Sequence, residues 1–399
     1  MNDWKTTQLG EIAKFTSGGT PSKQNAAFWG GDYPWISGKD LKQHYLKTSI
    51  DTLTKTGFEN AKIAPTGASL ILVRGMTLLK DFPVGFATKP MAFNQDVKAL
   101  IPKDEIDDLF FSYLLVGNKV SIRGLVSTAG HGTGRLDSQS IKDYAIKLPP
   151  LAEQKKIATI LETWDKAIVI TEQLVEQGRL QKKALAQQTL KIKKSICGIK
   201  SGWKLTSLRE LLSIRTIKQV PNEQVPLYSL TIAKGITAKT ARYNRDFLVK
   251  NSDGKKYKLV MPNDIVYNPA NLRWGAINYS RLSCCVVVSP IYEVLFLKNP
   301  NLNCHRFLSQ LLMSDTQIAK FATMIEGTVM ERKAVKIQPF LATKVMMPTT
   351  LCEQQKIAKI LTTADNEIAA LQQKLDYFKQ EKKALMQQLL TGRRRVKVE

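Results

Sequence analysis

The chain has few of the residues that build disulfide frameworks, metal sites and histidine-based active sites. It contains five cysteines and three histidines in 399 residues. The cysteines form no Cys-x-x-Cys pair and their total is odd, so neither a zinc site nor a disulfide framework is expected. The scarcity of histidine argues against acid–base catalysis by imidazole. The sequence therefore predicts reduced cysteines, no metal site and a cytoplasmic protein.

Long hydrophobic runs are also absent. A membrane-spanning helix needs about 20 consecutive apolar residues, and no such run occurs. The N-terminal residues Met1–Lys5 do not lead into the apolar core of a signal peptide. We therefore expect no membrane association.

Acidic residues are outnumbered by basic ones, 34 against 59, which gives a formal net charge of +25. The imbalance is greatest in residues 203–348, where 21 basic residues face 9 acidic ones. A surplus of this size indicates a polyanionic partner. Since a membrane is not expected, the sequence predicts a nucleic acid.

The chain does contain an internal repeat at an offset of 200 residues. Residues 153–190 and 353–390 are identical at 18 of 38 positions without a gap. The starts of the two halves also correspond, with Trp4-Lys5 matching Trp203-Lys204, but little similarity links the parts between. This period is too long for a solenoid. It predicts two half-proteins. Each consists of a globular domain with its own sequence, here called a head, followed by a long helix whose sequence the two halves share.

Apolar residues in both repeated segments follow the three- and four-residue steps of a coiled coil. Thr350 and Glu353 have the spacing of a capping box, whereas Gly178 weakens the first helix by about 1 kcal/mol relative to alanine. Leu174 also falls in the predicted seam of the first helix. The other residues predicted to line the seam are Ile157, Ile160, Leu161, Trp164, Ile168, Ile357, Ile360, Leu361, Ile368, Leu371, Leu375 and Phe378.

The two helices predict the architecture of the whole chain. Each covers about 40 residues, roughly 60 Å, and lacks a partner in its own half. We expect an intramolecular antiparallel coiled coil and hence a pseudo-twofold dumbbell; the alternative is that each helix packs on its own head. The predicted parts are a first head at 1–150, a first spacer helix at 151–200, a second head at 201–348, and a second spacer helix with a basic tail at 349–399.

Both heads have the mixed pattern of an α/β (α+β) domain. In the first head, residues 69–73 and 96–100 are strand-like, and residues 109–115 follow an acidic stretch that favours a helix start. The second head has a strand pattern at 265–267 and a helix pattern at 306–312.

Polar and basic loop residues are the candidate DNA contacts. Residues 16–23 form a flexible polar turn whose amides and hydroxyls suit phosphate oxygens. Residues 130–135 form a glycine-rich loop that ends in arginine, the side chain best suited to guanine. A surface or structural role is the alternative at every position. The candidates are Ser17, Thr20, Ser22, Lys23, Lys39, Lys42, Arg74, Thr133, Arg135, Lys218, Arg242, Arg245, Arg273, Trp274, Arg281, Arg332 and Lys333.

Catalytic motifs are missing. An adenine methyltransferase needs an (Asp/Asn/Ser)-Pro-Pro-aromatic loop, which neither residues 148–151 nor 268–271 provide. Gly38-Lys39 is followed by Asp40, so it does not end a phosphate-binding loop. We expect no catalytic residue and no cofactor bound by this chain. A self-contained DNA-modifying enzyme with an unrecognised site and a coiled-coil adaptor remain the alternatives.

Four stretches carry a resemblance to a known family: residues 17–22 (SGGTPS), 28–37 (FWGGDYPWIS), 148–154 (LPPLAEQ) and 387–396 (QQLLTGRRRV). With them the chain resembles the DNA-specificity subunit of type I restriction-modification enzymes over essentially its whole length. The resemblance implies two target-recognition domains, each recognising one half of a bipartite DNA target, with the helices setting the spacer.

The resemblance also implies partners. Two modification (methyltransferase) subunits, which bind S-adenosylmethionine and methylate adenine at N6, would dock on the paired helices. Restriction subunits, which use ATP and Mg²⁺ to translocate and cleave DNA, would join them. The chain itself would be a non-catalytic targeting subunit.

Overall fold

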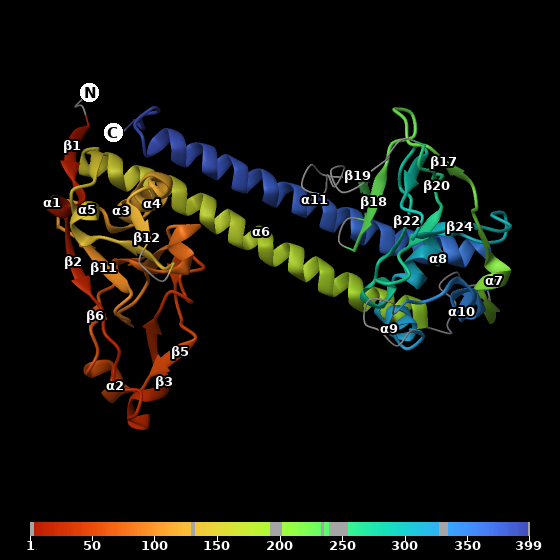
Figure 1. Cartoon of the computed structure of the whole chain (residues 1–399), viewed down its shortest axis with the longest axis horizontal. Coiled ribbons are helices and arrows are strands. Elements are labelled where there is room, and N and C mark those ends of the chain that lie inside the picture. Colours follow the sequence, from red (N-terminus) through yellow and green to blue (C-terminus); the bar gives the residue numbers. More distant parts are fainter. Residues whose placement is uncertain are drawn as a thin grey trace. The chain divides into compact units, whose positions relative to one another are not determined.

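The computed structural model describes residues 4–128, 132–191, 202–232, 235–238, 254–326 and 334–397 (Figure 1). The chain divides into two compact units. Unit 1 comprises residues 1–172 and 373–399, and unit 2 comprises residues 173–372. Each unit contains one head, part of the first long helix and part of the second.

The long helices are α6 (Leu151–Lys191) and α11 (Leu351–Leu389), and they pair antiparallel within each unit. In unit 1, Lys382 lies 2.5 Å from Asp165 and Lys379 lies 2.7 Å from Glu172. Residues of increasing number on α6 therefore contact residues of decreasing number on α11. In unit 2, Lys182 makes the repeat-equivalent ion pair with Asp365 at 2.6 Å. The predicted antiparallel pairing is confirmed.

Some residues of the predicted seam lie between the two helices, and others belong to the hydrophobic cores of the heads. Ile157 and Leu161 are fully buried but belong to the core of head 1, and Ile357 and Leu361 belong to that of head 2. The first turns of each helix thus pack on their own head, as in the alternative. Further along, the rings of Trp164 and Phe378 meet edge to face at 5.5 Å, and Leu375 is buried. Partial burial is found for Ile160, Ile168, Ile360, Ile368 and Leu371.

Two details of the helices differ from the sequence-based expectation. Leu174 was predicted in the seam, but it is 44% exposed and the neighbouring Val175 is buried instead. The capping box forms only in half: the Glu353 amide donates to the Thr350 hydroxyl at 3.4 Å, but both carboxylate oxygens of Glu353 are buried without a hydrogen-bond partner among the described residues.

Gly178 has a packing role in unit 2. A Cβ atom at this position would lie 3.1 Å from Cγ1 of Ile368. The absent side chain therefore lets α6 approach α11 closely. This contact explains why a residue with poor helix propensity stands in the middle of a long helix.

Head 1 is built on a five-stranded sheet with strand order β2-β11-β7-β9-β4. Its strands are β2 (Ala13–Ser17), β11 (Val97–Pro102), β7 (Ser69–Leu72), β9 (Val84–Ala87) and β4 (Tyr45–Leu46). Helix α3 (Asp108–Gly117) covers the sheet, and the side chain of Asp107 caps its N-terminus. The inner side chains of α3, including Phe110, Phe111 and Leu114, are buried in the same core as Leu70 and Leu100.

Smaller elements complete head 1. They are β1 (Lys5–Gln8), α1 (Leu9–Ile12), η1 (Ala26–Phe28), β3 (Trp29–Ile36), β5 (Asp51–Leu53), α2 (Lys55–Glu59), β6 (Ile63–Ala64), β8 (Arg74–Gly75), η2 (Met76–Leu79), β10 (Met91–Phe93), α4 (Lys119–Arg123), β12 (Val126–Thr128), β13 (Gly134–Leu136), α5 (Ser138–Lys142) and β14 (Ala145–Leu148). Strands β5-β3-β10-β6 and β12-β13-β8 form two further sheets, and β1 pairs with β14.

Head 2 repeats the central plan with different residues. Its main sheet has the order β16-β24-β21-β22, with β16 (Leu212–Ile214), β24 (Glu293–Leu297), β21 (Ile265–Tyr267) and β22 (Ile277–Tyr279). The remaining elements are β15 (Trp203–Ser207), α7 (Leu208–Leu211), β17 (Lys218–Gln219), β18 (Tyr228–Thr231), β19 (Gly235–Ala238), β20 (Tyr257–Val260), η5 (Leu272–Trp274), β23 (Val286–Val288), α8 (His305–Leu312), α9 (Asp315–Ala322), α10 (Ile337–Ala342) and β25 (Lys344–Pro348).

The two heads therefore share one topology. Strands β2, β11, β7 and β9 of head 1 correspond in order and direction to β16, β24, β21 and β22 of head 2. Helix α3 corresponds to α8, and the pair β1–β14 corresponds to β15–β25. The predicted strands at 69–73 and 265–267 and the predicted helices at 109–115 and 306–312 are confirmed.

The same aspartate of the repeat fastens each head to its helices. In unit 1, Asp165 accepts a hydrogen bond of 2.6 Å from the Tyr113 hydroxyl of α3 and pairs with Lys382 of α11. In unit 2, Asp365 accepts a hydrogen bond of 2.6 Å from the Gln310 amide of α8 and pairs with Lys182 of α6. Each head is thus held to both helices at one partly buried polar cluster.

In unit 1, the C-terminal tail binds the first turn of α6. The Arg395 guanidinium makes two 2.8 Å hydrogen bonds to the buried Glu153 carboxylate, and the Trp4 indole donates a third. Burial by itself raises the pKa of Glu153, but the hydrogen bonds from Arg395 and Trp4 outweigh burial and hold that pKa below its ordinary value. A carboxylate with a lowered pKa stabilises the fold above its unfolded-state pKa.

We expect Arg395→Ala to lower the free energy of unfolding by about 3 kcal/mol at pH 7, because it leaves a buried carboxylate without its cation. The difference from the unsubstituted protein should shrink below about pH 4, as Glu153 becomes protonated. Urea unfolding at both pH values measures this. Arg393→Ala, at an exposed position of the same tail, is the control. If both substitutions lowered the free energy of unfolding equally, the ion pair between Arg395 and Glu153 would not be the source of the stabilisation.

Candidate nucleic-acid interface

In head 1, most of the predicted DNA contacts lie in the loops at one edge of the main sheet. Strands β2 and β7 end, and β11 and β9 begin, at the same edge. We call residues 17–23, 73–83 and 94–96 the loop edge of head 1. By the same registers, residues 215–217, 268–276 and 289–292 form the loop edge of head 2.

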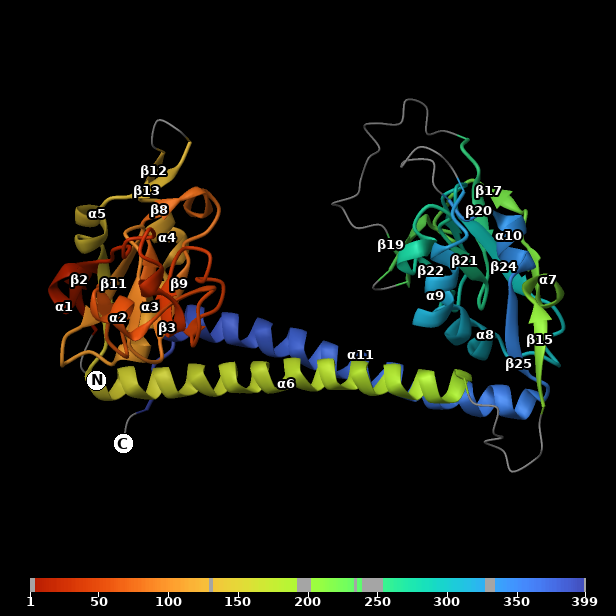
Figure 2. The same cartoon turned by 90° about the horizontal axis from the view of Figure 1, so that it is seen from below.

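Arg74 and Arg135 are brought together although 61 positions separate them in the chain. They are direct partners in the antiparallel pair β8–β13, and both side chains are exposed. Their small sheet lies at the end of the head remote from α6 (Figure 2). Like charges directly opposite each other on neighbouring strands destabilise a sheet. A bound anion removes this repulsion, so the pair is the strongest candidate for a phosphate or base contact. Thr133 directly precedes β13 and joins this surface.

The turn at 17–22 is less flexible than its composition suggests. The amide of Gly19 donates to the carbonyl of Phe93, and a Cβ atom on Gly18 would lie 2.2 Å from the carbonyl oxygen of Asn94. The prediction that the turn's amides are free for phosphate is therefore wrong for these two glycines, and Gly18 is also needed for close packing. The Ser17 hydroxyl accepts a hydrogen bond from Lys98, and that of Thr20 donates to Gln95.

Other candidates of head 1 lie near the same edge. Lys39 is exposed and follows Gly38, where an added Cβ would lie 2.9 Å from Leu72 at the end of β7. Ser22, Lys23 and Lys42 are exposed. Their contact with DNA stays a prediction.

In head 2 the loop edge carries Arg273 and Trp274 on η5. The Arg273 guanidinium lies 3.9 Å from the centroid of the Trp274 ring, which is the distance of a cation–π stack. The Nε atom of Arg273 is buried without a hydrogen-bond partner among the described residues, whereas the Trp274 side chain is 58% exposed. This stack presents a flat apolar surface beside a cation.

The structure separates the remaining candidates of head 2. Arg281 follows the far end of β22 and lies 3.6 Å from Asp365 of α11, so it is at the opposite edge from η5. Lys218 is exposed on β17. Arg242, Arg245, Arg332 and Lys333 lie outside the described residues.

Sequence reasoning missed the exposed Met76, which directly follows the strand of Arg74. Its side chain is 65% exposed on η2, and η2 lies against the β12–β13 pair. The available signal was the sequence Arg-Gly-Met directly after a buried strand, because such a glycine marks a turn.

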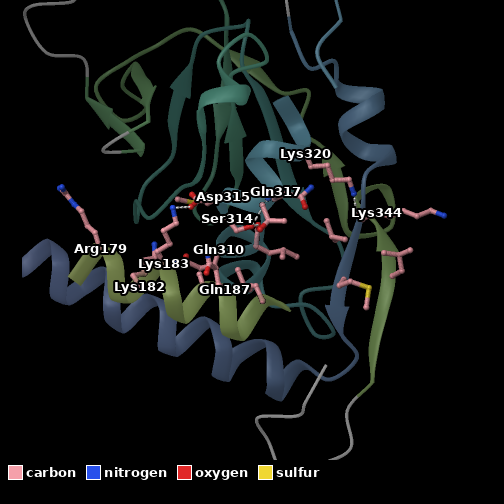
Figure 3. Close-up of a pocket in the computed structure, with 18 residues that line it drawn as sticks. Arg179, Lys182, Lys183, Gln187, Gln310, Ser314, Asp315, Gln317, Lys320 and Lys344 are labelled. Carbon is pink, nitrogen blue, oxygen red and sulfur yellow. Dashed lines mark hydrogen bonds and ion pairs between the residues drawn. The ribbon is translucent and has the colours of Figure 1, made fainter. Parts of the chain in front are cut away.

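A basic cavity of about 630 Å³ lies in unit 2 between the end of α6 and the α8–α9 and β15–β25 segments (Figure 3). Five of its lining residues are cationic: Arg179, Lys182, Lys183, Lys320 and Lys344. Its one carboxylate among the described residues, Asp315, is paired with Lys183 at 2.8 Å. The charged side chains of the lining are therefore predominantly cationic.

Across the described ranges, no group of three or more His, Cys, Asp or Glu side chains could hold a metal ion. Within the same ranges, no helix combines the length and apolar character needed to cross a membrane.

A duplicated head with one topology, two different basic loop edges and a paired-helix scaffold defines a class: a two-headed nucleic-acid-recognition protein. The family model described as "Type I restriction modification DNA specificity domain" matches residues 1–177 and again residues 200–378. The chain belongs to this family, and each half contains one copy of its domain.

The chain is similar to several specificity subunits. It is 33% identical over 185 residues to the type I restriction enzyme EcoR124I/EcoR124II specificity subunit of Escherichia coli, covering 45% of each chain. It is 24% identical to the MjaIX specificity subunit of Methanocaldococcus jannaschii, covering 64% of each. The chain thus spans about half to two thirds of these relatives. With the MjaVIII subunit of the same organism it is 24% identical, covering 99% of this chain and 94% of that one.

Solved structures share the fold. The crystal structure of the type I restriction-modification S subunit from M. genitalium matches 97% of this chain and 96% of its own, with a TM-score of 0.63 and 15% identity. A second solved structure, reported as "Structural basis underlying complex assembly and conformational transition of the type I R-M system", matches 98% of this chain and 98% of its own, with a TM-score of 0.56 and 16% identity.

Proposed function

We propose that this chain is the non-catalytic, sequence-specific DNA-binding subunit of a type I restriction-modification complex. Each head recognises one half of a bipartite target, and the paired helices set the spacer between the halves. The observation that carries the proposal is the Arg74–Arg135 pair, two exposed like charges held opposite each other on β8 and β13 of head 1. In head 2, the loop edge carries Arg273 on η5.

The proposed partners are double-stranded DNA, two modification subunits that bind S-adenosylmethionine, and restriction subunits that use ATP and Mg²⁺. Docking of the modification subunits along the long helices is supported by exposed apolar side chains on α6. Val169, Ile170, Leu174 and Leu180 are 44–58% exposed, which a fully solvated helix face would not favour.

Mapping of N6-methyladenine across the host genome, with and without this gene, tests the proposal. A split motif that disappears on deletion of the gene would support it and identify both half-sites. Co-purification of the chain with an active modification subunit, together with no gene-dependent motif, would contradict it. Methylation or cleavage by the isolated chain would favour a self-contained enzyme instead.

Arg135→Ala should weaken binding of the complex to its target by about 1–3 kcal/mol if the guanidinium contacts a guanine, and should relax specificity at one position of one half-site. Titration of target and non-target duplexes at several salt concentrations measures this. An equal loss on both duplexes, with a smaller salt slope, would instead assign Arg135 to a phosphate. Lys142→Ala, in α5 of the same head, is a charge-matched control.

A further inference from the structure

The connection across the loop edge of each head contains a short 3-10 helix with one buried leucine and one exposed apolar side chain, in opposite order along the chain. In head 1, η2 buries Leu78 completely and leaves Met76 65% exposed. In head 2, η5 buries Leu272 completely and leaves Trp274 58% exposed. The sequences of these two turns differ. What they share is a leucine that anchors the turn in the core and a large apolar side chain exposed to solvent.

Both turns are also held in the same way. The amide of Leu136, after the β12–β13 turn, donates to the carbonyl of Val73 at 2.9 Å, and the amide of Val335 donates to the carbonyl of Pro269 at 3.0 Å. Each 3-10 helix adjoins a glycine in a conformation that other residues rarely adopt. Gly75 (φ 149°) precedes η2, whereas Gly275 (φ 88°) follows η5. The exposed apolar side chain is therefore presented by an anchored turn.

Cations flank both side chains. Arg74 and Arg135 oppose each other on the strands next to Met76, and the Arg273 guanidinium stacks on the Trp274 ring. Folding favours neither the like-charge pair nor an exposed indole. Duplex DNA satisfies both, because its phosphates are anionic and its bases have flat apolar faces.

We propose that Met76 and Trp274 contact bases directly, each inserting at one base step of the half-site that its head recognises. The neighbouring arginines bind the groove and the phosphates beside that step. Apolar wedges can unstack a step and kink the duplex, and an indole adds a stacking surface. This inference rests on the proposed function and deepens it, since it names the side chains that deform the target.

The test uses the full chain in complex with its modification subunit and target duplexes that carry 2-aminopurine at successive positions. Unstacking of this base raises its fluorescence. The modification subunit itself flips out the adenine that it methylates, and this signal serves as an internal reference. We expect an increase at one further step in each half-site. Met76→Ala should abolish the increase in one half-site only, and Trp274→Ala in the other, with about 10- to 100-fold weaker target binding for Trp274→Ala. Trp274→Phe should retain most of the signal.

Ile63→Ala and Leu302→Ala are the controls, because these exposed apolar side chains lie on β6 and in the loop before α8, away from the 3-10 turns. They should leave signal and affinity unchanged. Unstacking that persists in both alanine variants at 76 and 274 would overturn the proposal, provided the unsubstituted complex binds its split target. If that complex binds no split target at all, the proposed function itself fails.

Discussion

Replacing residues 203–348 with the corresponding head of another family member should change one half of the methylated motif and leave the other half intact. The hydrophobic core of head 1, as far as the described residues define it, includes no residue from 203–348. The two ends of the graft also lie side by side, since Trp203 pairs with Pro348 in the β15–β25 ladder. Each mismatched base pair costs about 1–3 kcal/mol, so methylation of the old half-site should fall below detection.

Genome-wide mapping of N6-methyladenine in a host that expresses the hybrid measures this result. The donor head should keep a hydrogen-bond donor at the position of Gln310, because that side chain fastens the head to Asp365. A self-graft, with the same junctions and the original head, controls for damage at the joins. A change in both halves of the motif would show that the heads do not recognise DNA independently.

Lengthening both long helices together should lengthen the spacer of the target by about three base pairs. Residues 166–172 of α6 lie opposite residues 373–379 of α11, because the contacts Asp165–Lys382 and Gly178–Ile368 bracket both stretches. Duplicating both stretches adds seven residues to each helix, about 10 Å, and keeps the heptad repeat. Because a base pair rises about 3.4 Å, the half-sites should move apart by about three pairs.

The same methylation map gives the new spacer directly. Duplicating residues 166–172 alone is the control, because the added residues then lack a partner and the ion pairs beyond the insertion lose their register. That variant should lose methylation or stability. If the double-insertion variant still directs efficient methylation of targets with the original spacer, the length of the helices does not set the spacer.

The helices were predictable because their information is local and periodic. The repeat, the heptad steps and the antiparallel pairing follow from residues that are close in sequence or copied between halves. Leu174 was misplaced because it and Val175 both fit a pattern of three- and four-residue steps, and only packing decides which one faces the partner helix. Gly178 looked like a weakness because its benefit is a contact with Ile368, 190 positions away.

The candidate site was harder to predict because it depends on pairing between distant strands. Arg74 and Arg135 were each chosen from their loops, but nothing local shows that they face each other across β8 and β13. Met76 escaped attention because a methionine after a strand is usually core. The turn that contains Gly18 was assigned to phosphate binding because a glycine that permits tight packing and one that exposes its amide look alike in sequence.

By itself, the sequence determined that the chain is a duplicated, strongly basic two-headed protein with matched helices and no motif for catalysis, since composition, repeats and periodicity are properties of the chain alone. Tertiary structure decided which side chains share a surface. The ladders of each main sheet bring the connections after β7 and β21 to one edge, and buried leucines anchor their 3-10 turns there. Exposure at that edge depends on the atoms that pack around it, and most of those belong to residues far away in the chain.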